Sequence, residues 1–337
     1  MAFLLWLFIS SSLRAQPELQ CRERIEMGTP FKICVFADPK QKTQVDSDLE
    51  GSFEELRRID AWMSEWRENT ELSRVNAAAG KAPREVSNAL FELAQYALRV
   101  AQESGGAFDP TFNAFWGLYR FKEGDQREAT DSEIQSRLPL VNYRKLALDE
   151  KNRTLFLKEA GMKLGFGGLG QGYGVDQVVP RLKEKYSAGF VDGSGDTYFW
   201  GQKPSGELWI TAVRDPRDKS KELLRVYGTD FAITTCGDDE KFFFKNGRRV
   251  HHILDPKTGR PSTASRQITV LSRKALYADA WDTASFVIGP QKAFPILRKQ
   301  GMEAVGMDQQ ERIFISEGLV RKETAWGEVY EFPKSLR

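Results

Sequence analysis

The sequence predicts an α+β fold in which a helical N-terminal half packs on a largely antiparallel sheet. Before residue 105, apolar residues recur at the spacing of amphipathic helices, as in residues 45–66. Short β-branched and aromatic runs separated by glycine turns fill residues 188–253. Because helices cluster early and strands cluster late, this order favours α+β over a doubly wound sheet.

Composition and charge narrow the class of protein. The 337 residues carry 49 Lys and Arg against 47 Asp and Glu, a net charge of +2. This balance disfavours a broad basic face, so we expect no nucleic-acid partner. Two His and three widely spaced Cys exclude a His-rich or CxxC zinc site. With 41% hydrophobic residues the chain can bury a core, and we expect residues 16–337 to form one domain of two lobes, about 25–165 and 166–320.

The N-terminus has the pattern of an export signal. An apolar run at residues 2–9 leads through three Ser to Ala15, after which a polar, Pro-containing stretch begins. We expect residues 1–15 to be a signal peptide and the mature protein to reach the bacterial periplasm or cell envelope; a buried N-terminal helix or strand is the alternative. A lipid anchor at Cys21 is disfavoured because polar residues precede it. We expect the three Cys to be free or buried thiols rather than a disulfide, although export would permit one.

Further elements follow in order along the chain. Residues 31–37 are β-branched and apolar, which predicts a strand. After the helix at 45–66, a second helix is expected from the N-cap residue Ser87 to the Gly105-Gly106 pair. Later elements are two strands within residues 144–164, helices at 173–186, 277–287 and 291–299, and strands at 268–271, 303–307 and 312–316.

A Gly-rich loop precedes the helix predicted at residues 173–186. Glycine occupies six of the ten positions from 165 to 174. Glycines let backbone atoms approach a ligand closely, and a loop that opens a helix suits a phosphate or pyrophosphate. The spacing matches neither a P-loop nor a good dinucleotide fingerprint. A tight packing turn is therefore an equally good interpretation.

Residues 278–284 read ADAWDTA and form part of a predicted helix. Asp279 and Thr283 are four residues apart, so both oxygens project from one helical face. A carboxylate with a hydroxyl suits Mg²⁺, which also takes waters and substrate phosphate oxygens. A helix-terminal carboxylate beside a solvated Thr is the alternative.

The two His of the chain are adjacent, His251 and His252, and precede a Pro- and Gly-rich turn. A His beside a carboxylate can act as a general base near neutral pH. Alternation along a strand puts the two rings on opposite faces, so only one is expected to face a site. Glycine-containing strand ends at residues 192–196 and 234–238 are either turns or the walls of a cleft for an elongated phosphorylated ligand.

Taken together and in this order, these segments resemble the FAD:protein FMN transferase family, the ApbE-type flavin transferases. The matching segments are MGTPF (27–31), MS with ELS and Asn76 (63–76), GAFDPT (106–111), GGLGQGYGVD (167–176), DGSGD (192–196), TCG (235–237), HILDPKTG (252–259) and ADAWDTA (278–284). The resemblance implies an ApbE-like fold with a cleft for FAD between its lobes. It also implies Mg²⁺-dependent cleavage of FAD, transfer of FMN to a Thr or Ser hydroxyl of an acceptor protein, and release of AMP.

The resemblance also implies roles for single residues. Asp279, as a catalytic residue, and Thr283 would bind Mg²⁺ through their side chains and Gly170 through its backbone carbonyl, while His252 would be the base. The FAD-binding residues would be Met27, Trp66, Ala107, Phe108, Asp109, Gly167, Gln171, Tyr173, Thr235, His252 and Ile253. The acceptor would be an exported or membrane redox subunit.

The chain departs from the family pattern at several positions. Gln171 stands where many members have Lys, Gly165 replaces the Asp of D-x-GG, and Cys236 replaces the Ser of TSG. The loss of a positive charge at 171 keeps two alternatives open. One is an FAD pyrophosphatase that gives FMN and AMP, and the other is a non-catalytic FAD-binding protein.

Overall fold

The computed structural model of the chain describes residues 16–325 and 327–333. Its helices are α1 (Lys42–Met63), α2 (Glu71–Ala77), α3 (Asn88–Glu103), α4 (Asp131–Arg137), α5 (Gly170–Lys183), α6 (Ala275–Ile288) and α7 (Pro290–Lys299). The central sheet contains β1 (Glu18–Glu26), β2 (Thr29–Ala37), β6 (Gly189–Gly193), β7 (Asp196–Trp200), β10 (Phe231–Gly237), β15 (Ser265–Ser272), β16 (Glu303–Asp308) and β17 (Ile313–Ile315). A second sheet contains β8 (Trp209–Arg214), β9 (Glu222–Gly228), β18 (Val320–Thr324) and β19 (Gly327–Glu331). Shorter ladders are formed by β3 (Arg84–Glu85), β4 (Leu146–Asp149) and β5 (Thr154–Leu157), by β11 (Phe242–Lys245) and β12 (Arg248–His251), and by β13 (Leu254–Asp255) and β14 (Arg260–Pro261).

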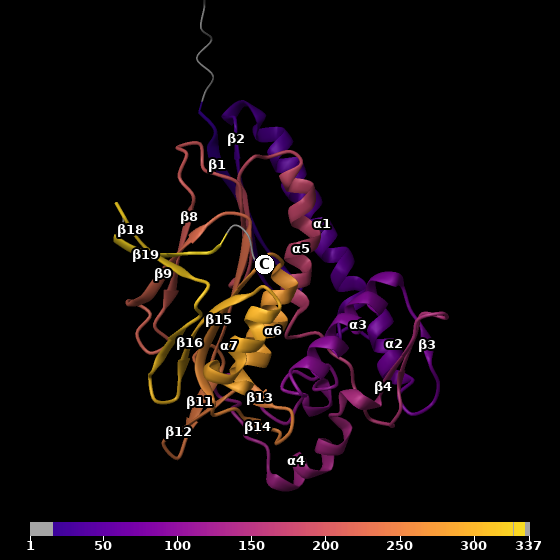
Figure 1. Cartoon of the computed structure of the whole chain (residues 1–337). Coiled ribbons are helices and arrows are strands. Elements are labelled where there is room, and N and C mark those ends of the chain that lie inside the picture. Colours follow the sequence, from indigo (N-terminus) through magenta and orange to yellow (C-terminus); the bar gives the residue numbers. More distant parts are fainter. Residues whose placement is uncertain (1–15, 326, 334–337) are drawn as a thin grey trace, which may run out of the picture.

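The central sheet separates two layers (Figure 1). Its strands lie in the order β1-β2-β6-β7-β10-β15-β16-β17, and every neighbouring pair is antiparallel. Helices α1, α5, α6 and α7 cover one face, where the main apolar core lies. The second sheet covers the other face through a smaller core that includes Phe199, Trp209 and Phe231. This arrangement confirms the predicted α+β class with a helical N-terminal half and an antiparallel sheet.

Helices begin at the capping residues that the sequence offers. Ser87 Oγ accepts a hydrogen bond from Leu90 N at 3.3 Å and starts α3, as predicted. Thr130 and Glu133 form a reciprocal capping box at the start of α4. α1 buries a stripe that includes Leu49, Phe53 and Leu56 on the sheet. Its helical spacing explains why this helix could be predicted.

The Gly-rich helix α5 packs closely against α6. A Cβ at Gly172 would lie 2.5 Å from the Ala275 carbonyl oxygen and 2.8 Å from Asp279 Cβ, so only glycine fits there. Asp176, one turn further along α5, accepts hydrogen bonds from Ala275 N and Leu276 N at 2.9 and 3.1 Å. It caps the N-terminus of α6 from another helix. The two helices are thereby fixed in one register.

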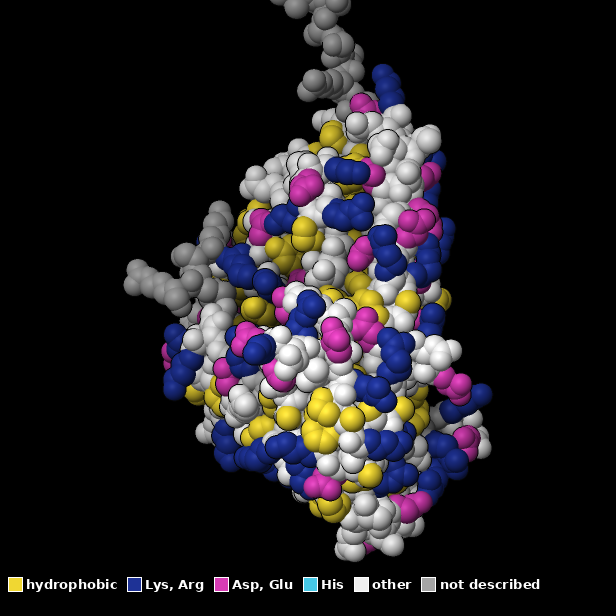
Figure 2. Space-filling view, turned by 90° about the vertical axis from the view of Figure 1, so that its right-hand side faces the viewer, with side chains coloured by type: hydrophobic (Ala, Val, Ile, Leu, Met, Phe, Trp, Pro, Cys, Tyr) yellow, Lys and Arg dark blue, Asp and Glu magenta, His cyan; other side chains and the backbone are white. Residues whose placement is uncertain are grey.

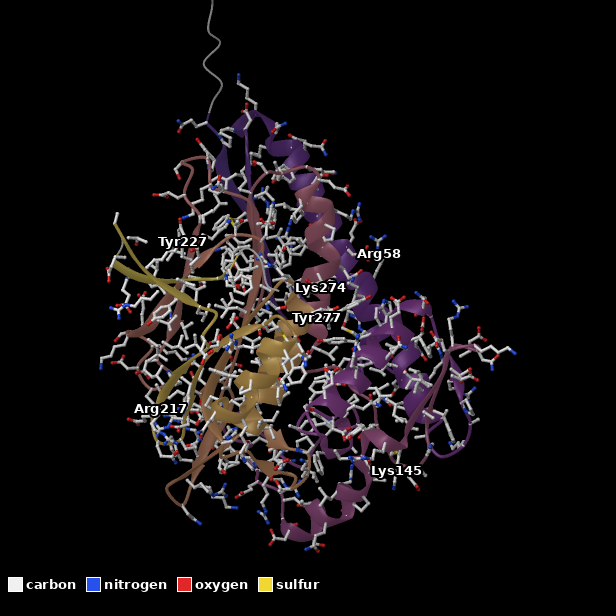
Figure 3. All side chains as sticks on the ribbon, in the orientation of Figure 1. Arg58, Lys145, Arg217, Tyr227, Lys274 and Tyr277 are labelled. Carbon is white, nitrogen blue, oxygen red and sulfur yellow. A yellow bond between two sulfur atoms is a disulfide. The ribbon has the colours of Figure 1, made fainter. Side chains whose placement is uncertain are left out.

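The ladder of β3, β4 and β5 packs with α2 and α3 beside α6. Tyr96 of α3 stacks on Tyr277 of α6 with ring centroids 4.9 Å apart. Figure 3 shows Lys274 and Tyr277 at the start of α6, and the Lys274 ammonium lies 5.3 Å from the Tyr277 ring centroid. β1 and β2, although early in the chain, pair with β6 in the central sheet.

Most predicted elements are present, with shifted ends, but several were not predicted, among them the short helices α2 and α4. β1 was missed because its sequence, ELQCRERIE, lacks a clear apolar alternation. The late pair β18 and β19 was also missed, since its exposed polar residues resemble a loop. The helix expected from residue 173 begins at Gly170, because packing on α6 overrides the low helix propensity of glycine.

The expectation of free thiols is wrong for two of the three Cys. Cys21 of β1 and Cys34 of β2 lie directly opposite each other and form a disulfide, with Cα atoms 4.2 Å apart. The pairing was not visible in the sequence because β1 was not predicted, and only the strand register places the two residues side by side. Cys236 is a free, partly buried thiol.

The predicted signal peptide, residues 1–15, lies outside the described residues. Among the described helices, none combines the length and the apolar character needed to cross a membrane. On the face drawn in Figure 2, Lys and Arg side chains lie among Asp and Glu side chains, in keeping with the net charge of +2.

Candidate active site

The Gly-rich loop faces helix α6. A Cβ built on Gly167 meets nothing within 4 Å, so the loop is open on that side. A Cβ on Gly168 would lie 3.3 Å from Thr283 Oγ1 and 3.4 Å from a ring carbon of Phe108. The structure therefore brings together the loop, ADAWDTA and GAFDPT, three segments far apart in the sequence.

Asp279 is joined to the first turn of α5. Its side chain is 5% exposed, and Oδ2 accepts a hydrogen bond from Gly172 N at 2.9 Å. Gly170, the first residue of α5, precedes this contact by two residues. Thr283 Oγ1 donates to Asp282 Oδ1 at 3.2 Å. The three residues predicted to hold a metal thus lie on two helix segments that touch each other.

Two carboxylates that the sequence did not assign to the site join Asp279. Asp196, at the start of β7, interacts with Asp279. Asp282 is 4% exposed and repels both. Burial and then mutual repulsion raise the pKa of Asp196 and Asp282, and burial raises the pKa of Asp279. The DGSGD segment was noticed as a strand end, but only the sheet order brings Asp196 to α6.

This concentration of two buried carboxylates and one half-buried carboxylate fits a divalent cation. No group of three or more His, Cys, Asp and Glu side chains among the described residues forms a metal site by itself. Mg²⁺ does not need one, because it binds one or two carboxylates and takes other oxygens from water and substrate phosphates. Asp279, the Thr283 hydroxyl and the Gly170 carbonyl would hold the ion, and its charge would relieve the repulsion around Asp196 and Asp282.

Cys236 borders the same cluster. Burial, and then repulsion from Asp282, raises the pKa of this thiol well above its ordinary value, so it stays protonated. The nearby Thr283 side chain opposes this rise in the pKa. The thiol thus occupies the place of the family Ser as a neutral group.

The two His residues have different environments, as strand alternation predicts. His251 is buried; its Nδ1 accepts from Ile253 N at 3.3 Å and its Nε2 lies 2.9 Å from Ser262 O. His252 Nδ1 is buried without a partner, and the ring packs edge-on to Phe121 at 6.4 Å. Burial lowers the pKa of His252 to about 4, with Lys241 adding repulsion, so the imidazole is neutral near pH 7. His251 is structural, and His252 has a nitrogen available.

The residues predicted to contact the flavin and adenine lie at different depths. Trp66 is 56% exposed and forms an edge-to-face pair with Trp116, ring centroids 4.0 Å apart. Ala107 and Phe108 are buried. Met27 adopts φ 51 and packs against the core, where its sulfur would lie 3.0 Å from a Cβ at Gly174. Each of the two exposed tryptophans offers the flat apolar face of its ring to a ring system.

Asp109 is already bonded within the protein. Its Oδ1 accepts from Thr111 N and Oγ1 at 2.8 and 2.6 Å, and its Oδ2 accepts from Tyr143 N at 2.8 Å. Burial raises the pKa of this carboxyl despite these bonds. Because both oxygens are engaged, we expect Asp109 to shape the loop that carries Ala107 and Phe108.

The remaining predicted FAD contacts lie on elements around the loop. Gln171 is half-buried in the first turn of α5, and Tyr173 packs edge-on to Trp62 at 5.8 Å. Thr235 Oγ1 lies 2.9 Å from Thr269 Oγ1 on the neighbouring strand. Ile253 is buried beside His252. The contacts of these four residues described above are all within the protein, so their part in FAD binding stays a prediction.

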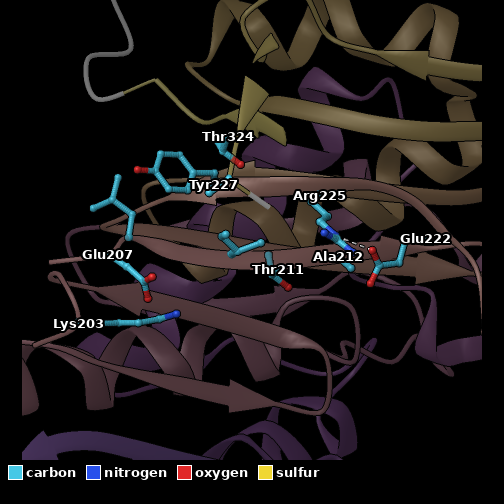
Figure 4. Close-up of a pocket in the computed structure, with 11 residues that line it drawn as sticks. Lys203, Glu207, Thr211, Ala212, Glu222, Arg225, Tyr227 and Thr324 are labelled. Carbon is cyan, nitrogen blue, oxygen red and sulfur yellow. Dashed lines mark hydrogen bonds and ion pairs between the residues drawn. The ribbon is translucent and has the colours of Figure 1, made fainter. Parts of the chain in front are cut away.

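A cavity of about 430 Å³ lies elsewhere, on the second sheet (Figure 4). Its lining includes Lys203, Glu207, Thr211 and Tyr227. None of its lining residues belongs to the motifs, so it is separate from the site at α5 and α6.

Fold and site together define an α+β protein whose Gly-rich loop faces an acidic helix. Residues 27–306 match the model of the ApbE family. The chain therefore belongs to this family, as its motifs predicted.

Similar proteins cover nearly the whole chain. An FAD:protein FMN transferase of Treponema pallidum is 29% identical over 325 residues, which is 91% of this chain and 89% of the relative. The FAD:protein FMN transferase of Salmonella typhimurium is 27% identical, covering 86% and 84%. The crystal structure of the ApbE protein from Thermotoga maritima superposes with a TM-score of 0.81 at 28% identity, covering 89% of this chain and 97% of that one. The flavin transferase ApbE from Vibrio cholerae, at 24% identity, gives 0.78, covers 89% and 98%, and shares the fold.

Proposed function

We propose that this transferase moves FMN from FAD to a Thr or Ser hydroxyl of an acceptor protein, with Mg²⁺, and releases AMP. The observation that carries the proposal is the contact of the Gly-rich loop with Asp279 and Thr283 in a chain that matches the ApbE family over residues 27–306. Relatives that span most of the chain are named FAD:protein FMN transferases.

Phosphoryl transfer requires that the reacting groups be positioned and that the negative charge of the diphosphate be neutralised. Bound Mg²⁺ would supply that neutralisation at the diphosphate. The open backbone at Gly167 would let phosphate oxygens approach the loop that precedes α5. Asp279 and Thr283 would face the same phosphates from α6.

The transfer step exchanges one P–O bond for another. The hydroxyl oxygen of the acceptor attacks the phosphorus of the FMN half and forms a phosphoester. The bond from that phosphorus to the bridging oxygen breaks, and AMP leaves with the oxygen. The hydroxyl proton passes to His252, whose neutral ring has an unpartnered nitrogen.

A single incubation separates the proposal from its alternatives. The protein is mixed with FAD and Mg²⁺, with and without a Thr-containing acceptor, and the products are separated. Covalent flavin fluorescence on the acceptor together with AMP supports transfer. FMN and AMP without an acceptor identify a pyrophosphatase, and intact bound FAD identifies a binding protein; either result overturns the proposal.

We further propose that the mature protein begins near Gln16 and is exported to the cell envelope, where an exported or membrane redox subunit is the acceptor. The Cys21–Cys34 disulfide supports an oxidising compartment. It also engages the Cys21 sulfur, which a lipid anchor would need. Intact-mass measurement on protein from its native host tests this proposal, and retention of Met1 in cytoplasmic material overturns it.

A further inference from the structure

We propose that Glu65 supplies, from a different part of the chain, the carboxylate that the family pattern places at position 165, and that it thereby positions the Gly-rich loop. Glu65 follows the C-terminus of α1, whereas Gly165 opens the loop. The inference rests on the proposed function, because the loop is where FAD would bind.

The Glu65 side chain occupies the space that a side chain at position 165 would need. A Cβ at Gly165 would lie 2.2 Å from Glu65 Oε2 and 2.9 Å from Asn113 Cβ. The φ of Gly165 is outside the left-handed region, so the backbone does not require glycine there. A side chain at 165 is therefore excluded by Glu65 and Asn113 alone.

Glu65 holds the loop through one backbone group. The backbone N–H of Phe166 favours the ionised form of the Glu65 carboxyl and so opposes the rise in its pKa. The Phe166 carbonyl in turn accepts from Leu169 N at 3.1 Å and from Gly170 N at 2.8 Å. These bonds join Phe166, which lies beside Glu65, to Gly170, whose carbonyl is the predicted backbone ligand of Mg²⁺.

A second anchor holds the other side of the same segment. Gly165 N donates to Pro110 O at 2.9 Å and ties the loop to the GAFDPT segment. Glu65 therefore fixes the loop toward α1 while Pro110 fixes it toward the loop that carries Phe108.

The burial of the Glu65 carboxyl indicates that position 65 requires an oxygen atom, and that an apolar side chain of similar size would not replace it. Oε2 is buried without a partner, and burial raises the pKa of the carboxyl to about 7 although Phe166 N and Lys163 oppose the shift. An apolar side chain would fill the space without this desolvation cost. The carboxyl is retained where it lies against the backbone of the loop at Gly165.

The test moves the carboxylate from one position to the other. Four variants are compared with the wild type: Glu65→Ala, Gly165→Asp, the double variant Glu65→Ala/Gly165→Asp, and the matched double variant Glu65→Ala/Gly165→Leu. Thermal unfolding of the FAD-free protein, FAD affinity with Mg²⁺, and the rate of FMN transfer are measured for each.

We expect Glu65→Ala to lower transfer by about 10–100-fold, as loss of an outer-shell partner does, and Gly165→Asp to lower the unfolding temperature through overlap with Glu65. The Asp double variant should recover part of the transfer lost in each single variant, because the two changes are coupled and only the contact with Asn113 remains. The Leu double variant keeps the same contact with Asn113, so it should recover the unfolding temperature to a similar extent but not transfer.

Two results overturn the proposal: equal recovery by Leu and Asp, or a single Gly165→Asp variant that behaves as the wild type. If the wild-type chain transfers no FMN, the proposed function fails. In that case the FAD affinities and unfolding temperatures of the same variants still decide whether the carboxylate was exchanged between the two positions.

Discussion

At the scale of single residues, His252 is the group whose chemistry the structure defines best. Its Nδ1 is buried and unpartnered, and its ring is neutral near pH 7. We expect His252→Ala to lower the transfer rate by about 10²–10⁴-fold, the usual contribution of a positioned base. FAD affinity should stay nearly unchanged, because in the proposed site the metal and the backbone would hold the diphosphate. Both quantities are measured on the one variant; weakened FAD binding with a preserved rate at saturating FAD contradicts the role of base.

His251→Ala is not the mild control that strand alternation alone suggests. The ring is 3% exposed and bonds to the backbone of Ile253 and Ser262. Its removal leaves a buried carbonyl unpaired, which costs about 1–3 kcal/mol. A stability defect in this variant would say nothing about catalysis.

The lowered pKa of His252 also predicts a pH dependence of stability. The pKa of His252 is about 4 in the folded protein and 6.5 ordinarily. Between these two pH values the unfolded chain therefore binds a proton that the folded chain does not bind. The stability linked to this residue is present above pH 6.5 and is lost as the pH falls through 4. Urea unfolding of the wild type and of His252→Gln should therefore converge or cross between pH 6.5 and 4, with the wild type losing more. A constant difference across this range contradicts the pKa.

The two carboxylates on α6, Asp279 and Asp282, should differ in how strongly their removal affects activity. Asp279→Ala removes the carboxylate that faces the loop and should abolish most Mg²⁺-dependent activity. Asp282→Ala should matter less, because the family places Ala or Ser there; since Asp282 accepts a hydrogen bond from Thr283, we expect a loss of metal affinity of about 10–100-fold. Activity is titrated with Mg²⁺ for both variants. Equal losses at saturating Mg²⁺ would show that the metal assignment is wrong.

At the scale of elements, the contact between α5 and α6 depends on one glycine. A Cβ at Gly172 would lie 2.5 Å from a backbone oxygen of α6, whereas one at Gly170 would meet only the flexible end of Met63 at 3.1 Å. We expect Gly172→Ala to lower the free energy of unfolding by about 1–3 kcal/mol, as overpacking does, and to reduce activity.

Gly170→Ala is the matched control for this prediction. It places the residue that the family has at this position and requires only a small movement of Met63. Its unfolding midpoint in urea should stay close to that of the wild type. If both variants are equally stable, the two helices are not held as closely as their backbones indicate.

At the scale of the whole molecule, the disulfide ties the edge strand β1 to the sheet. The bridge closes a loop across 13 positions, for which loss of a disulfide costs about 3 kcal/mol. Reductant should lower the unfolding temperature of the wild type. The variant Cys21→Ser/Cys34→Ala should unfold at the lower temperature with or without reductant. Thiol titration of the unfolded, unreduced protein should find one free thiol, Cys236; three free thiols would contradict the bridge.

The sequence by itself determined the class of fold, most helices and strands, and the family. These features depend on neighbours along the chain, such as the apolar stripe of α1, the Ser87 cap and the eight motifs in series. The residues expected to hold Mg²⁺, Asp279 and Thr283, share a helical face that spacing alone reveals.

Only the tertiary structure decided which distant groups meet. The approach of Asp196 to Asp279, the cap that Asp176 provides for α6, the Cys21–Cys34 pair and the place of Glu65 at Gly165 all depend on sheet order or on helix packing. A local pattern contains no distance between such residues, because each pair is set by the register of two elements separated by tens of residues or by a strand that the sequence did not reveal. The burial that shifts the pKa values of the ionisable side chains also arises only when these distant elements pack together.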